Sequence, residues 1–295
     1  MRLIFIGTAG STPTKFRGLP SVAIDYNSEI FLFDCGEGTQ RQMMQFSVNI
    51  AKIKAIFLTH THGDHVLGIA GLVRTLALNR RTEPLEIYVP KGGEDLVATL
   101  ISFDKAVMNY KIIIKSIKEG EVYKGRDFSI SAFKLLHTTN TLGFVFKEQD
   151  KLKFLKPKIK GLGLKGEDFR KLIKNKSIKV GNKTIKLKDL TFSKPGRKIV
   201  YATDTRPTSE TSKAAKGADI FIHESTYSNA EKELAKLRYH STSIEAATVA
   251  KKAGAKRLLL THPSARYRDE KILVGEARKV FKNTEIAKDG MIINL

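Results

Sequence analysis

The sequence predicts an α/β protein in which helices pack on the outside of β-sheets. Short apolar runs rich in Ile, Val, Phe and Leu recur in both halves of the chain, and each is bounded by turn residues or charges. Stretches with apolar residues at helical spacing alternate with these runs. This alternation is typical of proteins that cover sheets with helices. A chain of 295 residues is also long enough to bury a substantial core.

In the first half, six apolar runs have the strand pattern. In chain order the predicted strands are Leu3–Ile6, Ser21–Asp25, Ile30–Asp34, Ala55–Thr59, Leu85–Val89 and Ser129–Leu135. One helix is predicted over Asp64–Leu78, because apolar residues from Leu67 onward recur every three or four positions.

The second half repeats this style. Strands are predicted at Ile199–Thr203, Asp219–Glu224 and Arg257–Thr261, and helices at Ser243–Ala253 and Asp269–Val280. Ser241 or Thr242 is a natural N-cap for the first of these helices. The chain shows no strict internal repeat.

Composition excludes several classes of protein. The apolar content of 41% is too high for a disordered chain. No apolar run approaches the roughly 20 residues that span a bilayer, so we expect no membrane insertion. The N-terminus has no h-region or small-residue cleavage site, so we expect no export. Cys35 is the only cysteine, which excludes an intrachain disulfide, favours a buried structural thiol and predicts a cytoplasmic protein.

The charge is strongly positive and unevenly distributed. Lys and Arg number 52 against 30 Asp and Glu, a net charge of +22, which favours a polyanionic partner. A Lys-rich surface that serves solubility, or a hot or salty cell, explains the total equally well. Residues 151–198, however, hold 17 basic and three acidic side chains, so +14 of the charge lies there. We interpret this segment as a basic arm inserted in a single domain of residues 1–295, and predict contact with nucleic acid. The alternative is a solvated loop without a partner.

The strongest motif is Thr59-His60-Thr61-His62-Gly63-Asp64-His65, directly after an apolar strand. His60 and His62 project from the same side of an extended chain, so both can bind one cation. Gly63 lets the chain turn, so that Asp64 and His65 address a second cation about 3.5–4 Å away, as in two-metal hydrolases. Imidazole and carboxylate without thiolate suit zinc, with manganese or iron as substitutes.

Further ligand types stand at the ends of other apolar strands, where they would line a shared cleft. These are His137, Asp204 and His262, and Asp204 could bridge two cations. His240 is a candidate proton donor for a leaving oxygen, and Glu224 could orient it. For His223, a structural and a functional role remain equally open.

The pattern His-x-His-x-Asp-His, with a later His, Asp and His, resembles the metallo-β-lactamase superfamily. Further motifs resemble tRNase Z (ribonuclease Z) in its short form, the tRNA 3′-processing endonuclease. They are Gly36-Glu37-Gly38-Thr39-Gln40-Arg41-Gln42, Asp204-Thr205-Arg206, His223-Glu224-Ser225-Thr226, His240-Ser241-Thr242 and Ser264-Ala265-Arg266-Tyr267. The match runs from Ile4 to near the C-terminus.

This resemblance implies an αβ/βα four-layer sandwich with an inserted basic arm, two zinc ions per subunit, and a homodimer in which one subunit's arm grips tRNA for the other's active site. It implies that one zinc is held by His60, His62 and His137, the other by Asp64, His65 and His262, and that Asp204 bridges them. The family's catalytic histidine and glutamate fall on His240 and Glu224. Its loop that senses the CCA end falls on Pro13–Gly18, with Gly18 in place of Asn.

The resulting hypothesis is an endoribonuclease that removes the 3′ trailer of precursor tRNA after the discriminator nucleotide and leaves a 3′-hydroxyl. Asp64 could accept a proton from the attacking water, while His240 protonates the departing 3′-oxygen. The candidate contacts to substrate are Lys15, Arg17, Arg41, Arg206 and Arg266.

Two rivals remain. A small-molecule phosphodiesterase or arylsulfatase-like hydrolase of the same superfamily shares the metal motifs but gives no reason for the basic segment. A non-catalytic RNA-binding protein explains that segment but leaves the ligand set unexplained.

Overall fold

The structure is a computed structural model of the whole chain, and it describes residues 1–102, 108–181 and 183–295. The chain divides into two compact units. The larger consists of Met1–Phe146 and Lys198–Leu295, and the smaller of Lys147–Arg197. Among the described helices, none has both the length and the apolar character needed to cross a membrane.

The first sheet of the larger unit has the strand order β18-β1-β2-β3-β4-β5-β6 within the described residues. The strands are β1 Arg2–Gly7, β2 Ser21–Tyr26, β3 Glu29–Phe33, β4 Ile53–Phe57, β5 Leu85–Pro90, β6 Ile112–Ile117 and β18 Ile292–Asn294. Pairing is antiparallel from β18 to β3 and parallel from β3 to β6.

The second sheet has the order β17-β16-β15-β14-β9-β8-β7. Its strands are β7 Gly120–Lys124, β8 Phe128–Lys134, β9 Leu142–Glu148, β14 Lys198–Ala202, β15 Ile220–Glu224, β16 Leu258–Thr261 and β17 Thr284–Ile286. Strands β14 to β17 are parallel, so their carboxyl ends meet at one edge of the sheet.

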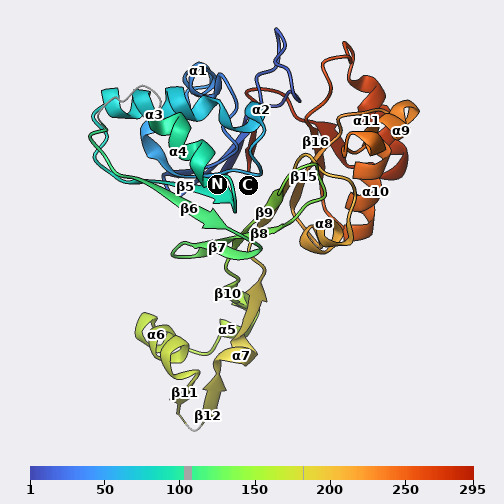
Figure 1. Cartoon of the computed structure of the whole chain (residues 1–295). Coiled ribbons are helices and arrows are strands. Elements are labelled where there is room, and N and C mark those ends of the chain that lie inside the picture. The colour runs from blue at the N-terminus through green and yellow to red at the C-terminus, as the bar shows by residue number, and fades with distance from the viewer. Residues whose placement is uncertain (103–107, 182) are drawn as a thin grey trace. The chain divides into compact units, whose positions relative to one another are not determined.

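Helices cover the outer face of each sheet (Figure 1). The first sheet carries α1 Thr39–Gln45, α3 Gly68–Leu78 and α4 Glu94–Ser102, and the second carries α8 Ser209–Ala214, α10 Ser243–Ala253 and α11 Lys271–Val280. The shorter elements of this unit are η1 Ile50–Lys52, α2 Gly63–Val66, η2 Asn229–Glu231 and α9 Lys232–Leu237. The prediction of an α/β four-layer sandwich is confirmed.

Three apolar clusters hold the layers together. One lies between the sheets and contains the stacked rings of Phe33 and Phe57, whose centroids are 5.4 Å apart. The second packs the first sheet against α1, α3 and α4, and includes Cys35, which is fully buried as predicted. Burial raises the pKa of the Cys35 thiol to about 12, so it stays protonated. The third packs the second sheet against α8, α10 and α11.

The helix predicted over Asp64–Leu78 is wrong in one respect, because the chain forms two helices that are interrupted at Leu67. The Gly68 amide leaves the helical ladder and donates to the carbonyl oxygen of Cys35 at 2.9 Å. A Cβ at Gly68 would lie 2.0 Å from the Gly36 carbonyl oxygen, so glycine is required for this close approach. The N-cap of α10 is Thr242, which forms a capping box with Glu245.

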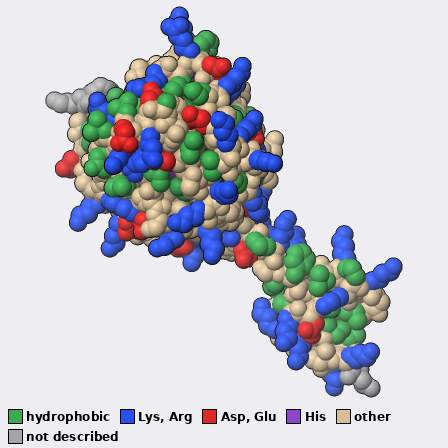
Figure 2. Space-filling model, turned by 90° about the vertical axis from the view of Figure 1, so that its right-hand side faces the viewer, with side chains coloured by type: hydrophobic (Ala, Val, Ile, Leu, Met, Phe, Trp, Pro, Cys, Tyr) green, Lys and Arg blue, Asp and Glu red, His purple; other side chains and the backbone are tan. Residues whose placement is uncertain are grey.

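The smaller unit has its own apolar cluster, formed by Leu172, Leu187 and Leu190 with partly buried neighbours. Its elements are β10 Lys151–Phe154, α5 Lys156–Ile159, α6 Gly166–Asn175, β11 Ser177–Val180, β12 Lys183–Lys186, α7 Leu187–Leu190 and β13 Thr191–Lys194. Strands β11 and β12 pair antiparallel, as do β10 and β13. Each lysine from 151 to 194 is exposed, and Figure 2 shows lysine and arginine side chains spread over the surface of this unit.

Candidate metal centre

The candidate ligands stand just beyond the carboxyl ends of strands from both sheets. His60 and His62 follow β4, and the turn at Gly63 starts α2, which carries Asp64 and His65. The remaining three follow β8, β14 and β16, and are His137, Asp204 and His262. The structure brings all seven into two adjacent groups that share Asp204.

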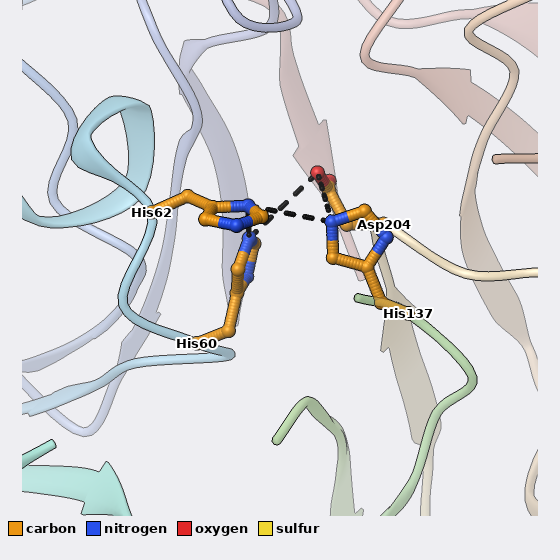
Figure 3. Close-up of side chains that lie close together, drawn as sticks. All are labelled: His60, His62, His137 and Asp204. Carbon is orange, nitrogen blue, oxygen red and sulfur yellow. Dashed lines mark hydrogen bonds and ion pairs between the residues drawn. The ribbon is translucent and has the colours of Figure 1, made fainter. Parts of the chain in front are cut away.

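The first group consists of His60, His62, His137 and Asp204, and their side chains converge on one point (Figure 3). His60 Nε2 and His62 Nδ1 are 2.9 Å apart, and His137 Nε2 is 3.3 Å from the same His62 atom. Asp204 Oδ2 lies 3.8 Å from both His60 Nε2 and His137 Nε2. One carboxylate oxygen therefore faces three imidazole nitrogens.

The second group consists of Asp64, His65, His262 and the other oxygen of Asp204. Asp204 Oδ1 is 3.4 Å from His65 Nε2 and 3.2 Å from His262 Nε2. Asp64 Oδ2 lies 3.4 and 3.5 Å from the same two nitrogens. Asp204 thus presents one oxygen to each group, which is the geometry of a bridging ligand.

The donor sets fit divalent cations in two respects. Ligands 2.0–2.1 Å from a tetrahedral centre lie about 3.3 Å from one another, and the separations within each group scatter around that value. In addition, His65 Nε2 and His262 Nε2 are buried without a hydrogen-bond partner. Buried polar atoms normally have partners, so these nitrogens are explained if each binds a cation.

Asp34 contacts one of the candidate ligands, although the sequence predicts no role for it. Its Oδ2 lies 2.9 Å from His65 Nδ1 and accepts from the Tyr201 hydroxyl at 2.9 Å. Its Oδ1 accepts from the Thr59 amide at 2.8 Å. Because Asp34 binds His65 at Nδ1, the Nε2 lone pair of His65 is directed toward the second group. Asp34 follows the tip of β3, the same sequence context that singled out Asp204 after β14.

Replacing Asp34 with asparagine is expected to weaken metal binding by about 10- to 100-fold, because an amide cannot fix the His65 ring as a carboxylate does. Competition with a metal-sensitive chelator measures this change directly. Tyr201→Phe is the matched control, because it removes a single bond to Asp34 and leaves the bond to His65 in place. Equal affinity in Asp34→Asn and the wild type would show that Asp34 does not orient the ligand.

Three strand-tip residues adopt backbone angles that are uncommon for residues with a Cβ. Asp34, Asp204 and His262 have φ values of 58°, 56° and 58°. Left-handed backbone costs roughly 1–3 kcal/mol outside glycine, and such residues cluster at functional sites. Each of the three residues follows a strand by one or two positions, so the left-handed conformation lies where the chain leaves that strand.

His240 and Glu224 form a third contact beside the two groups. His240 Nδ1 is 2.9 Å from Glu224 Oε1, and Glu224 is fully buried. Burial lowers the pKa of His240, but the charge and hydrogen bond of Glu224 outweigh it and raise the pKa to about 9. Burial raises the pKa of Glu224, yet the interaction with His240 lowers it to about 2. The pair is therefore an imidazolium held by a carboxylate at neutral pH.

His223 lies outside both candidate ligand groups. Its Nδ1 is 2.7 Å from the Glu224 carbonyl oxygen, and its ring packs 5.3 Å from that of Phe221. Phe221 belongs to the apolar cluster beneath α10, so His223 points into that core and away from the ligands. The structure favours the structural role for this residue.

The candidate substrate contacts divide into two sets. Arg17 and Arg206 already bind carboxylates with both arms of their guanidinium groups, Arg17 with Glu270 and Arg206 with Glu245. Arg206 also donates to the His240 carbonyl oxygen at 2.5 Å. Both guanidinium groups thus connect distant segments of the chain, and their contact with phosphate stays a prediction.

The other three candidate contacts line hollows in the surface of the larger unit. They are Lys15, Arg41 and Arg266. Lys15 and Arg41 line a hollow of about 440 Å³ together with residues of the 13–18 loop. Arg266 lines the cleft of about 480 Å³ that contains His62, Asp64 and His240. His137 and Asp204 line the same cleft, so it opens onto both ligand groups.

Two family models match parts of the chain. One, described as anti-Pycsar protein Apyc1, matches residues 1–155, and the other, described as a beta-lactamase superfamily domain, matches residues 175–263. The first range includes His60–His65 but not Asp204, His240 or His262.

Curated relatives match over the whole length. Ribonuclease Z of Methanothermobacter thermautotrophicus is 38% identical over 297 residues, covering 100% of this chain and 97% of the relative. Ribonuclease Z of Gemmatimonas aurantiaca is 40% identical over 298 residues, covering 99% and 95%. Among solved structures, human tRNase Z, short form, has a TM-score of 0.72 at 27% identity and covers 100% of this chain and 99% of that one. YhfI of Bacillus subtilis, at 20% identity and a TM-score of 0.73, shares the metallo-β-lactamase fold.

Proposed function

Because the chain belongs to the ribonuclease Z family, it is a metal-dependent hydrolase of the tRNA 3′-processing type, and we propose that it cuts precursor tRNA after the discriminator nucleotide with two zinc ions. The observation that carries this proposal is the placement of Asp204, which presents one oxygen to each of two ligand groups.

In this proposal His60, His62 and His137 would hold one cation, Asp64, His65 and His262 would hold the other, and Asp204 would contribute to both. A pair of bound divalent cations lowers the pKa of a water ligand and neutralises charge on phosphoryl oxygens. The imidazole and carboxylate donors suit zinc, with manganese or iron as substitutes. The protein keeps the ligands in place through Asp34 and the strand tips.

The chain's own groups supply the proton transfers. Asp64 Oδ2 accepts a hydrogen bond from the Ser11 amide at 3.0 Å, and Asp64 lines the cleft, where it can accept the proton of the attacking water. His240 also lines the cleft and can protonate the departing 3′-oxygen. Glu224 keeps His240 charged and oriented through the 2.9 Å contact at Nδ1, so that Nε2 is the donating atom.

We assign tRNA binding outside the catalytic cleft to the basic segment 151–198. Its lysines from 151 to 194 are exposed, and its small apolar cluster gives it a fold of its own on which to present them. Contacts of this kind bind the phosphate backbone without reading the sequence. They also make affinity depend steeply on salt.

Removing residues 151–194 is expected to impair cleavage of precursor tRNA but not hydrolysis of a small phosphodiester. Lys151 and Lys194 are paired across two antiparallel strands, so a Gly-Gly linker can join the cut ends without stretching the chain. The two activities, measured side by side over a salt series, check this. Equal loss of both activities would contradict the proposed role of the segment.

We also propose a homodimer, as the resemblance implies. Exposed apolar side chains lie on and beside neighbouring helices, with exposures of 55% for Met44 on α1, 49% for Leu67 and 82% for Leu78 on α3. Gln40 of α1 bonds Thr75 of α3, so the two helices lie side by side. Charged substitutions at Met44 and Leu78 are expected to give monomers in sedimentation experiments. A wild-type chain that sediments as a monomer would rule out the dimer.

The single cysteine is consistent with a reducing cytoplasm as the site of this activity. The alternative of a small-molecule phosphodiesterase is tested by comparing turnover of precursor tRNA with that of cyclic nucleotides. Higher kcat/KM on cyclic nucleotides would favour that alternative.

A further inference from the structure

One wall of the catalytic cleft has no role in the steps above. It consists of Tyr227, Leu234, Leu237, Arg238 and Arg266, which line the same cleft of about 480 Å³ as His62, Asp64 and His240. We call these five residues the α9 wall. Leu234, Leu237 and Arg238 are three and four positions apart, so they share one face at the end of helix α9.

The α9 wall offers an apolar surface to whatever enters the cleft. Leu237 is 72% exposed and Leu234 is partly buried. Leucine side chains in this cleft cannot contribute to metal binding. They suit a flat, weakly polar group such as a nucleobase.

Tyr227 and Arg266 add a planar, charged part to this wall. The Arg266 guanidinium carbon lies 5.0 Å from the centre of the Tyr227 ring, and Tyr227 is only 8% exposed. Arg266 is held by Glu231 at 2.7 Å and by the Ser264 hydroxyl at 3.2 Å. Its side chain nevertheless keeps 43% of its surface exposed. A guanidinium plane that is fixed in this way can stack on a base.

The wall lies beside the proposed proton donor. Helix α9 ends at Leu237, and the His240 amide donates to the Ala235 carbonyl oxygen at 2.8 Å. The oxygen that His240 protonates is the 3′-oxygen of the discriminator nucleotide, so the ribose of that nucleotide must lie next to His240. The base of that nucleotide then meets the surface that continues from His240. The scissile phosphate, which the first trailer nucleotide keeps after cleavage, lies on the side of the ligand groups.

We propose that the α9 wall binds the base of the discriminator nucleotide by stacking and apolar contact. This inference rests on the proposed function. The side chains of Leu234 and Leu237 have no polar group. The Arg266 guanidinium is engaged by Glu231 and Ser264, so this stacking surface is not built to read a base edge. The wall is therefore expected to accept all four bases with similar efficiency, because each has a face that can stack.

The test compares three precursor tRNAs: the intact substrate, one with an abasic discriminator nucleotide, and one with an abasic first trailer nucleotide. The abasic discriminator is expected to lower kcat/KM of the wild type by about tenfold, since stacking of one base contributes about 1–3 kcal/mol. Leu237→Ala and Arg266→Lys, which keeps the charge but loses the plane, are expected to lower kcat/KM on the intact substrate by severalfold. Both variants should then lose less from the abasic discriminator than the wild type loses.

Ile272→Ala is the matched control, because Ile272 is 49% exposed on α11 and does not line the cleft. Metal content is measured for each variant, so that a lost cation is not mistaken for a lost base contact. Variants that keep the full wild-type penalty for the abasic discriminator overturn the inference, as do variants that lose the penalty for the abasic trailer nucleotide instead. A wild type that cuts none of the three substrates overturns the proposed function itself.

Discussion

Replacing Asp204 with alanine is expected to remove both cations and to abolish cleavage of precursor tRNA. Among the described residues, Asp204 alone belongs to both groups, with Oδ1 toward His65 and His262 and Oδ2 toward His60 and His137. Charge stabilisation by a metal pair contributes several kcal/mol to the transition state, so kcat should fall by about 10³-fold or more. Metal analysis of the purified variant should show less than one cation per chain.

Asp269→Ala is the control for this experiment, because the Asp269 side chain is 67% exposed and lies outside both groups. Circular dichroism should show that both variants are folded. An Asp204→Ala protein that keeps two cations and cuts precursor tRNA at the wild-type rate would contradict the bridging assignment.

Replacing His240 with alanine is expected to lower kcat on precursor tRNA by about 10²- to 10⁴-fold while metal content stays unchanged. The physical reason is loss of the proton for the leaving 3′-oxygen, which the His240 imidazolium held by Glu224 would supply. Glu224→Gln should cause a smaller loss, because the imidazole remains but its charge is no longer stabilised.

The choice of leaving group separates a proton donor from a structural residue. A phosphodiester that releases p-nitrophenolate needs no proton on departure, so His240→Ala should hydrolyse it nearly as well as the wild type. Tyr239→Phe is the control, because the Tyr239 carbonyl oxygen that contacts His137 Nδ1 at 3.1 Å is unchanged. An equal loss of kcat on both substrates would show that His240 has a structural role and is not the proton donor.

The sequence was sufficient to predict the α/β class and the strand-tip positions of the candidate ligands. The reason is physical: ligands that follow apolar strands are brought to one edge when those strands lie parallel, as β14, β15 and β16 do. The compact motif from His60 to His65 is also local, so its geometry depends on only a few backbone angles. Family resemblance supplied the grouping of the ligands and the substrate.

What could not be predicted depends on contacts between distant segments. Asp34 and His65 meet only because β3 and β4 are neighbours, and the break at Leu67 arises from the bond between Gly68 and Cys35. The ion pairs of Arg17 and Arg206 also join segments that are distant in the sequence. Glu270 is 253 residues from Arg17, and Glu245 is 39 residues from Arg206, so their ion pairs have no signature in the local sequence.

The edge strands β6, β7, β17 and β18, which are three to six residues long, were also missed. Strand β18, Ile292–Asn294, is only three residues long and is defined by its pairing with β1. Strand β6 and its partner β5 form a parallel pair whose register is set across a long connection. Elements of this kind become visible only when their partners are known.

The most direct test of the two-cation hydrolase is incubation of the purified protein with an end-labelled precursor tRNA, with and without a chelator. The account predicts a single cut after the discriminator nucleotide, with a 3′-hydroxyl on the tRNA. It also predicts that the chelator abolishes this cut and that added zinc restores it. Cleavage that continues unchanged in a protein shown to be metal-free would contradict the account.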